Sequence, residues 1–268
     1  MAAMLILLAF AGCTGGETPK NPDTSMPDTS NEGDSNAATL ADIDYVKNKG
    51  TLVVGITDFA PMDYKESGSD EWTGFDAELA KAFAESLGVK AEFIEIDWDN
   101  KIFELDAKKI DCIWNGMTIT DELLLNTSCS NPYVRNKQVV VMAADKVADY
   151  ADVASLAGLE FAVEAGSAGE NAASDNDLTY TAVKTQADAL MEVKAGTSDA
   201  CIIDSTMASS MTGEGTDYAD LAAGLVLADE EYGISFRKNS DLTAQLNTFL
   251  TEYEGLQALA EKYNLVLI

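Results

Sequence analysis

Several polar residues come directly after apolar runs of strand length. In a folded sheet they would lie at the ends of the strands, where a small molecule could bind. Residues 111–114 are of strand length and apolar after Asp111, and Asn115 and Gly116 follow them at once as a turn signal. In open α/β sheets, small ligands bind at the carboxyl ends of the strands. We therefore expect the carbonyls of Asn115 or Gly116 and the hydroxyl of Thr118 to face a ligand. Ordinary turn polarity would explain the same residues.

Two further positions could bind opposite charges. Asp204 follows a buried strand predicted at residues 200–203, and a buried carboxylate is tolerated there only if a cation meets it. Its alternative role is the N-cap of a helix that begins at Ser205. Ser167 and Ala168 lie where another helix begins, so free amides and the helix dipole favour an anion there. A simple serine N-cap is the alternative.

Alternating strands and helices must position these residues. Residues 51–56 are β-branched and apolar enough for a buried strand. Phe75 then opens a helix whose apolar residues recur every four positions up to Gly88. A strand at 91–96 and a helix at 98–109 deliver the chain to the strand before Asn115. These spacings predict right-handed βαβ units and a largely parallel sheet.

The remaining chain predicts a second lobe and a return to the first. A strand at 138–142 crosses to the second lobe, and one at 232–237 crosses back, which makes a hinge around a cleft. Further elements are expected as strands at 160–164 and 200–203 and helices at 186–195 and within 242–263. The predicted fold class is α/β, with two lobes of mainly parallel sheets joined by a two-crossing hinge. Lobe 1 comprises residues 41–136 and 230–268, and lobe 2 comprises residues 137–229.

The charge balance excludes several function classes. The chain has 46 acidic and 17 basic residues, a net charge of −29, and only two arginines. Nucleic acid is excluded as a partner because phosphate binding needs basic patches. We interpret the acidity as solubility outside the cell, with capture of cationic ligands as the alternative. Histidine is absent, which removes the commonest general base and most zinc sites. We expect no metal and no cofactor.

The N-terminus predicts export and anchoring. Residues 1–13 form an apolar run ending in Phe10-Ala11-Gly12-Cys13, which resembles the lipobox of a bacterial lipoprotein with Cys13 as the lipidated residue. No Lys or Arg precedes the run and Phe10 stands where leucine is usual, so a plain secretory signal is the alternative. Residues 14–40 are polar and rich in Gly, Ser, Thr and Pro, which predicts a disordered tether.

Residues 111–120, followed by Ser130, Pro132 and Tyr133, resemble the signature of the amino-acid-type (family 3) extracellular solute-binding proteins of bacterial ABC importers. Other matching stretches are Gly74-Phe75-Asp76, Gly166-Ser167 and Tyr232-Gly233-Ile234, and the resemblance covers nearly everything from Gly50 to Tyr263. It implies a type II periplasmic-binding fold that closes on one amino acid or similar polar solute and hands it to a permease. The lipid anchor would place it outside the cytoplasm, and we expect a monomer.

The resemblance also implies roles for site residues. Asp204 matches the position that binds the solute ammonium, while Ser167, Ala168 and Thr118 would serve its carboxylate. Phe59 and Trp98 match positions that sandwich the solute side chain, with core packing as the alternative. Trp114 is either core or cleft floor.

One departure concerns the carboxylate. The relatives carry an arginine three residues after the threonine that corresponds to Thr120, and Leu123 stands there in this chain. Either Ser167, Ala168 and Thr118 hold the carboxylate alone, or the ligand is not a standard α-amino acid. Arg135 is the only arginine close enough in sequence to substitute, because Arg237 is expected near the surface of the returning strand.

Other readings remain open. The scaffold could carry an enzyme similar to cyclohexadienyl dehydratase, with Glu164 or Glu170 as acid or base. It could also be a sensor domain, which would need a transmembrane helix and an output domain that residues up to Ile268 do not contain.

With Cys13 lipidated, three cysteines remain, so at least one of Cys112, Cys129 and Cys201 is a free thiol. A disulfide through Cys129 stays open.

Overall fold

The computed structural model describes residues 41–268, which build an α/β fold around one long mixed sheet. The signal segment, Cys13 and the tether predicted for residues 1–40 lie outside the described residues. Within the described part, no helix is long and apolar enough to cross a membrane.

The first lobe contains the elements before the first crossing and the last two helices. They are α1 (Asp42–Lys49), β1 (Thr51–Ile56), β2 (Tyr64–Lys65), β3 (Trp72–Thr73), α2 (Phe75–Ser86), β4 (Lys90–Glu95), the 3₁₀ turn η1 (Trp98–Asn100), α3 (Lys101–Asp106), β5 (Cys112–Thr118), α4 (Asp121–Asn126), β6 (Thr127–Cys129), α8 (Leu242–Glu252) and α9 (Leu256–Lys262).

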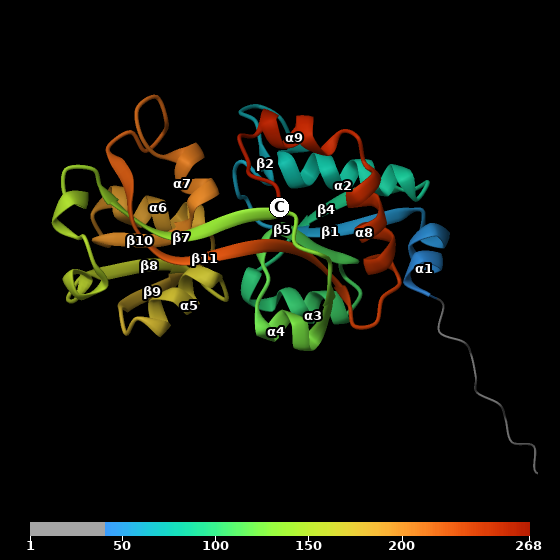
Figure 1. Cartoon of the computed structure of the whole chain (residues 1–268), viewed down its shortest axis with the longest axis horizontal. Helices are drawn as coiled ribbons and strands as arrows, with labels where there is room; N and C mark the ends of the chain where they lie inside the picture. The colour runs from blue at the N-terminus through green and yellow to red at the C-terminus, as the bar shows by residue number, and fades with distance from the viewer. Residues whose placement is uncertain (1–40) are drawn as a thin grey trace, which may run out of the picture. The chain divides into compact units, whose positions relative to one another are not determined.

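The second lobe lies between two long crossing strands, β7 (Val134–Ala143) and β11 (Leu221–Arg237). It contains η2 (Val147–Asp149), η3 (Val153–Leu156), β8 (Glu160–Glu164), α5 (Ala168–Asp175), β9 (Thr179–Val183), α6 (Gln186–Ala195), β10 (Ala200–Asp204) and α7 (Ser205–Met211). Figure 1 shows β7 and β11 running side by side from one group of helices to the other.

The sheet is parallel at both ends and antiparallel in the middle. Its strand order is β4-β1-β5-β11-β7-β10-β8-β9, and β6 also pairs with β11. The predicted parallel ladders are present as β1 with β4 and β5, and as β8 with β9 and β10. The crossing strands pair antiparallel with each other, from Ala143 opposite Leu221 to Val134 opposite Tyr232. Two register shifts in β11, between Ala223 and Ala228, bend this two-stranded ribbon in the second lobe.

The central strand is longer than its sequence predicts. Strand β5 continues through Asn115 and Gly116 to Thr118, so the turn predicted at Asn115 is wrong. The reason is a distant partner: Met117 and Thr118 pair with Gly233 and Tyr232 of β11, and Ile113 pairs with Ser235, with a register shift between Gly233 and Ser235. A glycine is needed all the same, since Gly116 has a φ of 52°.

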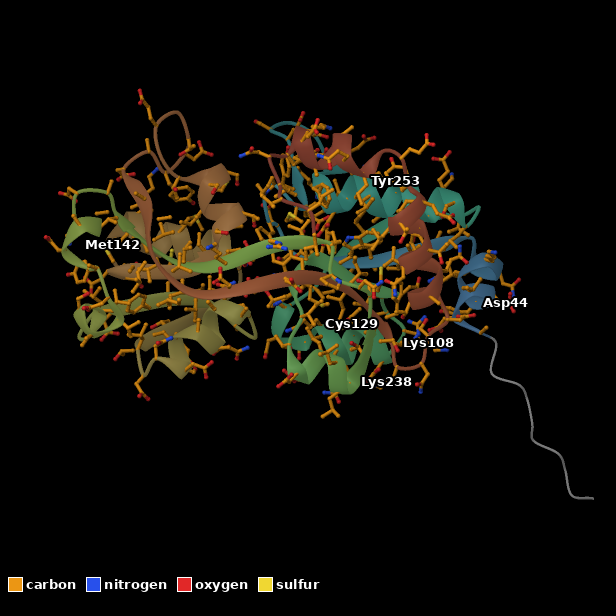
Figure 2. All side chains as sticks on the ribbon, viewed as in Figure 1. Asp44, Lys108, Cys129, Met142, Lys238 and Tyr253 are labelled. Atoms are coloured by element: carbon orange, nitrogen blue, oxygen red, sulfur yellow. The ribbon has the colours of Figure 1, made fainter. Side chains whose placement is uncertain are left out.

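Helix α2 and the core of the first lobe form as the sequence predicts. Phe83 of α2 packs on Trp114 of β5 and Phe249 of α8, with ring centroids 6.1 and 5.4 Å apart. The second lobe has its own apolar cluster, which includes Phe161, Ile202 and Met142. Figure 2 shows Met142 in that lobe and Tyr253 in the first.

The cysteines of the described part are free thiols. Cys112 and Cys201 are buried in strands, where burial raises the pKa of both thiols and makes them small apolar side chains. Cys129 is half-buried on β6, and its sulfur lies 3.0 Å from the Ser235 hydroxyl.

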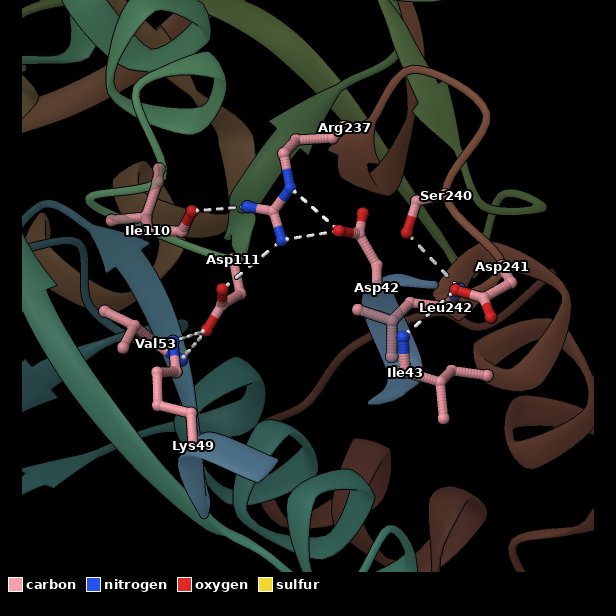
Figure 3. Close-up of polar contacts among 10 residues, drawn as sticks. All are labelled: Asp42, Ile43, Lys49, Val53, Ile110, Asp111, Arg237, Ser240, Asp241 and Leu242. Atoms are coloured by element: carbon pink, nitrogen blue, oxygen red, sulfur yellow. Dashed lines mark hydrogen bonds and ion pairs between the residues drawn. The ribbon is translucent and has the colours of Figure 1, made fainter. Parts of the chain in front are cut away.

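A buried ion-pair network fastens α1 to the amino end of the sheet (Figure 3). Asp111 is fully buried and accepts hydrogen bonds from the Val53 amide at 2.8 Å and from Lys49 Nζ at 2.5 Å. Arg237 reaches Asp111 at 3.4 Å, Asp42 at 3.1 Å and the Ile110 carbonyl at 2.9 Å. Arg237 is only 8% exposed, so the prediction that it lies near the surface is wrong.

Arg237→Met should destabilise the protein by about 3 kcal/mol, because it leaves Asp42 and the Ile110 carbonyl unpaired and removes one cation from Asp111. Urea unfolding measures this. Lys137→Met is the matched control: it breaks an exposed ion pair with Asp229 at 3.0 Å, so it should cost less than about 1 kcal/mol. Equal losses in the two variants would contradict a structural role for the buried network.

Candidate functional site

A cavity lies between the lobes, and residues of both lobes line it. Its volume of about 30 Å³ is space for roughly one or two water molecules. All of the site residues predicted from the sequence line it: Phe59, Trp98, Asn115, Gly116, Thr118, Leu123, Ser167, Ala168 and Asp204. The lining also includes residues that the sequence did not assign to binding, namely Lys101, Met117, Thr120, Glu122, Glu164, Gly166, Asn171 and Gln186.

Asn115 holds the first-lobe wall together. Its side-chain oxygen accepts from the amide and hydroxyl of Thr57 at 2.9 and 2.7 Å, and its nitrogen donates to the Thr57 carbonyl and to Asp63 at 3.0 and 2.8 Å. The side-chain amide of Asn115 is therefore bound to the protein itself. Thr118 is half-buried, lies at the end of the same strand and lines the cavity.

A buried carboxyl fixes the next residue of this wall. The Gly116 amide donates to Asp76 at 2.6 Å, and the Tyr133 hydroxyl donates to the same carboxyl at 2.8 and 2.9 Å. Burial raises the pKa of Asp76 to about 7, and these hydrogen bonds limit the rise. A Cβ on Gly116 would lie 2.6 Å from the Phe59 ring, so the close approach of this aromatic side chain requires glycine.

The two predicted aromatic residues are largely covered by protein. Phe59 and Trp98 are 2% and 7% exposed, and Trp98 packs in an apolar cluster with Leu105 and Leu123. Both residues still line the cavity. Trp114 is fully buried and does not line the cavity, which assigns it to the core rather than to the cleft floor.

The second-lobe wall begins at the loop before α5. The Ser167 hydroxyl caps α5 by accepting from the Glu170 amide at 3.1 Å, while Glu170 accepts from the Gly166 amide at 2.7 Å. This loop also touches the first lobe, since a Cβ on Gly166 would lie 2.7 Å from the Cα of Asp99. The Ser167 side chain is thus an N-cap, and Ala168 begins the helix at the cavity wall.

Asp204 is a buried carboxyl surrounded by neutral donors. It is 4% exposed and accepts hydrogen bonds from Tyr232 at 2.7 Å and from the side-chain amides of Asn136 and Gln186. Although it occupies the N-cap position of α7, its side chain makes no capping bond, so the alternative reading of a helix cap is wrong. Burial and the nearby charge of Glu230 raise its pKa well above the usual range.

No cation pairs with Asp204 among residues 41–268. Glu230, the neighbouring carboxyl, shares the Asn136 amide with it and accepts from Gln138 at 2.8 Å. A positive group entering the cavity would therefore meet a carboxyl whose ionisation the fold disfavours. A carboxyl in these surroundings can pair with an ammonium or another compact cation.

Glu164 is a second buried carboxyl on the cavity wall. It ends strand β8, is 2% exposed, and its Oε1 has no hydrogen-bond partner in the described part of the chain. Burial raises its pKa to about 8, against the opposing effects of the Lys101 charge and a Gln186 hydrogen bond. Glu164 therefore carries its proton in most molecules at pH 7.

Lys101 places a positive charge in the same cavity. Its side chain is held at the lobe contact, with Nζ donating to the Gly166 carbonyl at 2.8 Å and to the Trp98 carbonyl at 3.2 Å. It is 8% exposed, and burial lowers its pKa. The signal that could have found it is spacing, because Lys101 lies three residues after Trp98 and four before Leu105, on the inward face of one helical segment.

The arginines do not reach the cavity. Arg135 is exposed and lines a separate groove with Lys137 and Glu231, so the structure does not support it as a substitute for a cleft arginine. Arg237 belongs to the Asp111 network at the other end of the strands. Leu123 faces the cavity as an apolar residue and is 2% exposed.

Comparisons with known proteins agree with this architecture. The model of the family "Bacterial extracellular solute-binding proteins, family 3" matches residues 52–265. The chain is 31% identical to the arginine-binding extracellular protein ArtP of Bacillus subtilis, over 80% of this chain and 86% of that protein. It is 30% identical to the L-cystine-binding protein TcyJ of Escherichia coli, over 82% and 85% of the two chains.

Solved structures show the same fold. A P235GK mutant of ArgBP from T. maritima superposes with a TM-score of 0.76 at 35% identity, covering 83% of this chain and 99% of that one. The ancestral amino acid-binding protein AncCDT-1, described as a precursor of cyclohexadienyl dehydratase, superposes with a TM-score of 0.74 at 31% identity, covering 82% and 98%. The predicted two-lobe type II fold is confirmed, and a family match from β1 to the end of α9, around a cleft built by both lobes, means that the chain belongs to the bacterial extracellular solute-binding proteins of family 3.

Proposed function

We propose that this amino-acid-binding protein captures a free amino acid with a cationic side chain between its lobes and delivers it to an ABC permease. The observation that carries the proposal is Asp204, a carboxyl at the cavity wall that is surrounded by neutral donors and one further carboxyl, with no cation paired to it in residues 41–268. The α-ammonium of an amino acid would supply the missing charge.

The second buried carboxyl favours a second positive group on the ligand. Glu164 has an unpartnered oxygen and lines the same cavity as Asp204. A guanidinium or ammonium at the end of the ligand side chain would stabilise its ionised form, and Trp98 and Phe59 would pack against the aliphatic part. ArtP is named as an arginine-binding protein, so L-arginine is the first ligand to test.

Capture requires the lobes to separate, because a cavity of about 30 Å³ is too small for an amino acid. Contacts across the cleft that would break include Lys101 with the Gly166 carbonyl, an exposed ion pair of Lys184 with Asp97 at 3.6 Å, and a hydrogen bond from Ser210 to the Ala60 carbonyl at 3.1 Å. Hydrogen bonds of Asp204 and Thr206 to Asn136 and Tyr232 also join the lobes, next to the crossing strands. We place the hinge in β7 and β11, near the proposed lobe boundaries at residues 136–137 and 229–230.

Delivery would occur at the outer face of a cell membrane. A lipid on Cys13 would anchor the protein, and residues 14–40 would act as the tether between lipid and cleft. This arrangement suits a monomer that closes on its solute and docks on permease subunits. Membership of an extracellular solute-binding family supports a site of action outside the cytoplasm.

An enzyme on this scaffold is the second candidate. Glu164 keeps its proton near neutral pH and faces the cavity, as a general acid would. AncCDT-1 is an amino acid-binding protein described as the precursor of a dehydratase. Recovery of unchanged amino acid from the protein after long incubation, measured by mass spectrometry, would support binding alone, whereas its conversion would support the enzyme.

Asp204→Asn should weaken binding of L-arginine by about 30-fold or more, because the ligand ammonium loses its charged partner. Isothermal titration calorimetry measures the change, and thermal melting checks that the variant folds. Asp229→Asn is the control, since Asp229 is exposed on β11 and pairs only with Lys137. Unchanged affinity in Asp204→Asn would remove the ammonium assignment.

Affinity for L-arginine should rise with pH between about 6 and 8, by up to about tenfold per unit. The cation binds the ionised form of Glu164, whose pKa is about 8 in the folded protein, so below that pH binding must expel a proton. Titrations at several pH values measure the slope, and proton release appears as a buffer-dependent heat of binding.

Glu164→Gln should lower that slope because glutamine does not titrate. Glu160→Gln, at the exposed start of the same strand, is the matched control and should leave the slope unchanged. A wild-type affinity that is flat or falls across this pH range would contradict ionisation of Glu164 by the ligand.

A further inference from the structure

We propose that Lys101 binds the carboxylate of the ligand and thereby selects for amino acids over the corresponding amines. The inference rests on the proposed function, in that the cleft takes an amino acid. Lys101 lies at the cavity wall and contacts both lobes, through the Trp98 carbonyl in the first and the Gly166 carbonyl in the second.

The Lys101 ammonium is held in position before any ligand contact. The Gly166 and Trp98 carbonyls accept two of its N–H groups at 2.8 and 3.2 Å, and the Trp98 ring centroid lies 5.0 Å from Nζ. An ammonium has three N–H donors, so one remains for a further acceptor. Carbonyls and a ring orient the side chain without neutralising its charge.

Lys101 is the one basic residue in the lining of this cavity, which is drawn from residues 41–268. The acidic residues of the lining are Glu122, Glu164 and Asp204. A ligand carboxylate in this cavity would be repelled by whichever of these carboxyls is ionised and attracted only by Lys101 and by backbone amides. Leu123 packs as an apolar residue in the Trp98 cluster, so it contributes no charge.

The position of the ammonium also fits an anion. Lys101 Nζ donates a hydrogen bond to the Gly166 carbonyl, and α5 begins two residues later at Ala168. The ammonium therefore contacts a residue that is close in sequence to the positive end of the α5 helix dipole. A carboxylate near both groups would be held by one charged donor and by helix amides. Asp204 and Glu164 would remain for the positive groups of the same ligand.

A purely mechanical role is the competing explanation, because the hydrogen bond to Gly166 also links the two lobes. The two roles differ in what they do to a ligand without a carboxylate. A lobe link would help all ligands equally. A carboxylate partner helps amino acids and repels amines, which carry only positive charge.

The test compares L-arginine with agmatine, its decarboxylated amine, on the wild type and on Lys101→Met. In the wild type, L-arginine should bind at least about 30-fold more tightly than agmatine. In Lys101→Met, affinity for L-arginine should fall by a similar factor, while affinity for agmatine should stay the same or rise. Calorimetric Kd values give both ratios, and agmatine binding itself shows that the variant is folded.

Two further variants sharpen the comparison. Lys101→Arg keeps the charge and should retain a preference for L-arginine. Lys109→Met, which removes an exposed lysine paired with Glu104 at 2.9 Å, should leave both affinities unchanged.

An equal loss of L-arginine and agmatine affinity in Lys101→Met would overturn the assignment and leave amino-acid binding intact. If the wild type does not bind L-arginine, the pairs L-lysine with cadaverine and L-histidine with histamine replace it. A wild type that binds none of these amino acids would refute a basic amino acid as the ligand, and the role of Lys101 with it.

Discussion

The cost of burying a carboxyl without a counter-charge is the constraint on which the site depends. Asp204 and Glu164 both lie at the wall of a narrow cavity, and burial raises the pKa of each. The fold tolerates them because neutral donors surround Asp204 and because Glu164 can hold its proton. The cationic ligand that we propose would relieve this cost, so removal of the carboxyl burial penalty would add to the free energy of its binding.

The strands and helices that position these groups could be predicted from local pattern. β1, β8 and α6 have the predicted bounds because the two strands are short continuous apolar runs and α6 buries Ala189, Leu190 and Val193 at helical spacing. Two cavity residues could also be predicted from local pattern, because Asp204 directly follows a predicted strand and Ser167 lies at the start of a predicted helix. The predictions that were wrong or missing concern residues whose conformation or burial depends on partners far away in the sequence.

Three particular residues show why. Asn115 is predicted in a turn, whereas pairing with β11, more than a hundred residues later, on both sides of Asn115 makes it part of a strand. Arg237 was predicted near the surface, and the carboxylates of Asp42 and Asp111 allow its burial. Lys101 was not assigned to binding because a lysine on a helix suggests a solvated face, and only the Gly166 loop of the other lobe shows that it is covered.

The pairing of β7 with β11 has a mechanical consequence. The two segments that connect the lobes pair with each other and form one hydrogen-bonded two-stranded ribbon. Sliding one lobe along the other would break rungs of that ribbon, whereas flexing or twisting it keeps them intact. The ribbon therefore favours bending or twisting of the lobes over sliding, and a movement of that kind leaves the pairing register of β7 and β11 unchanged.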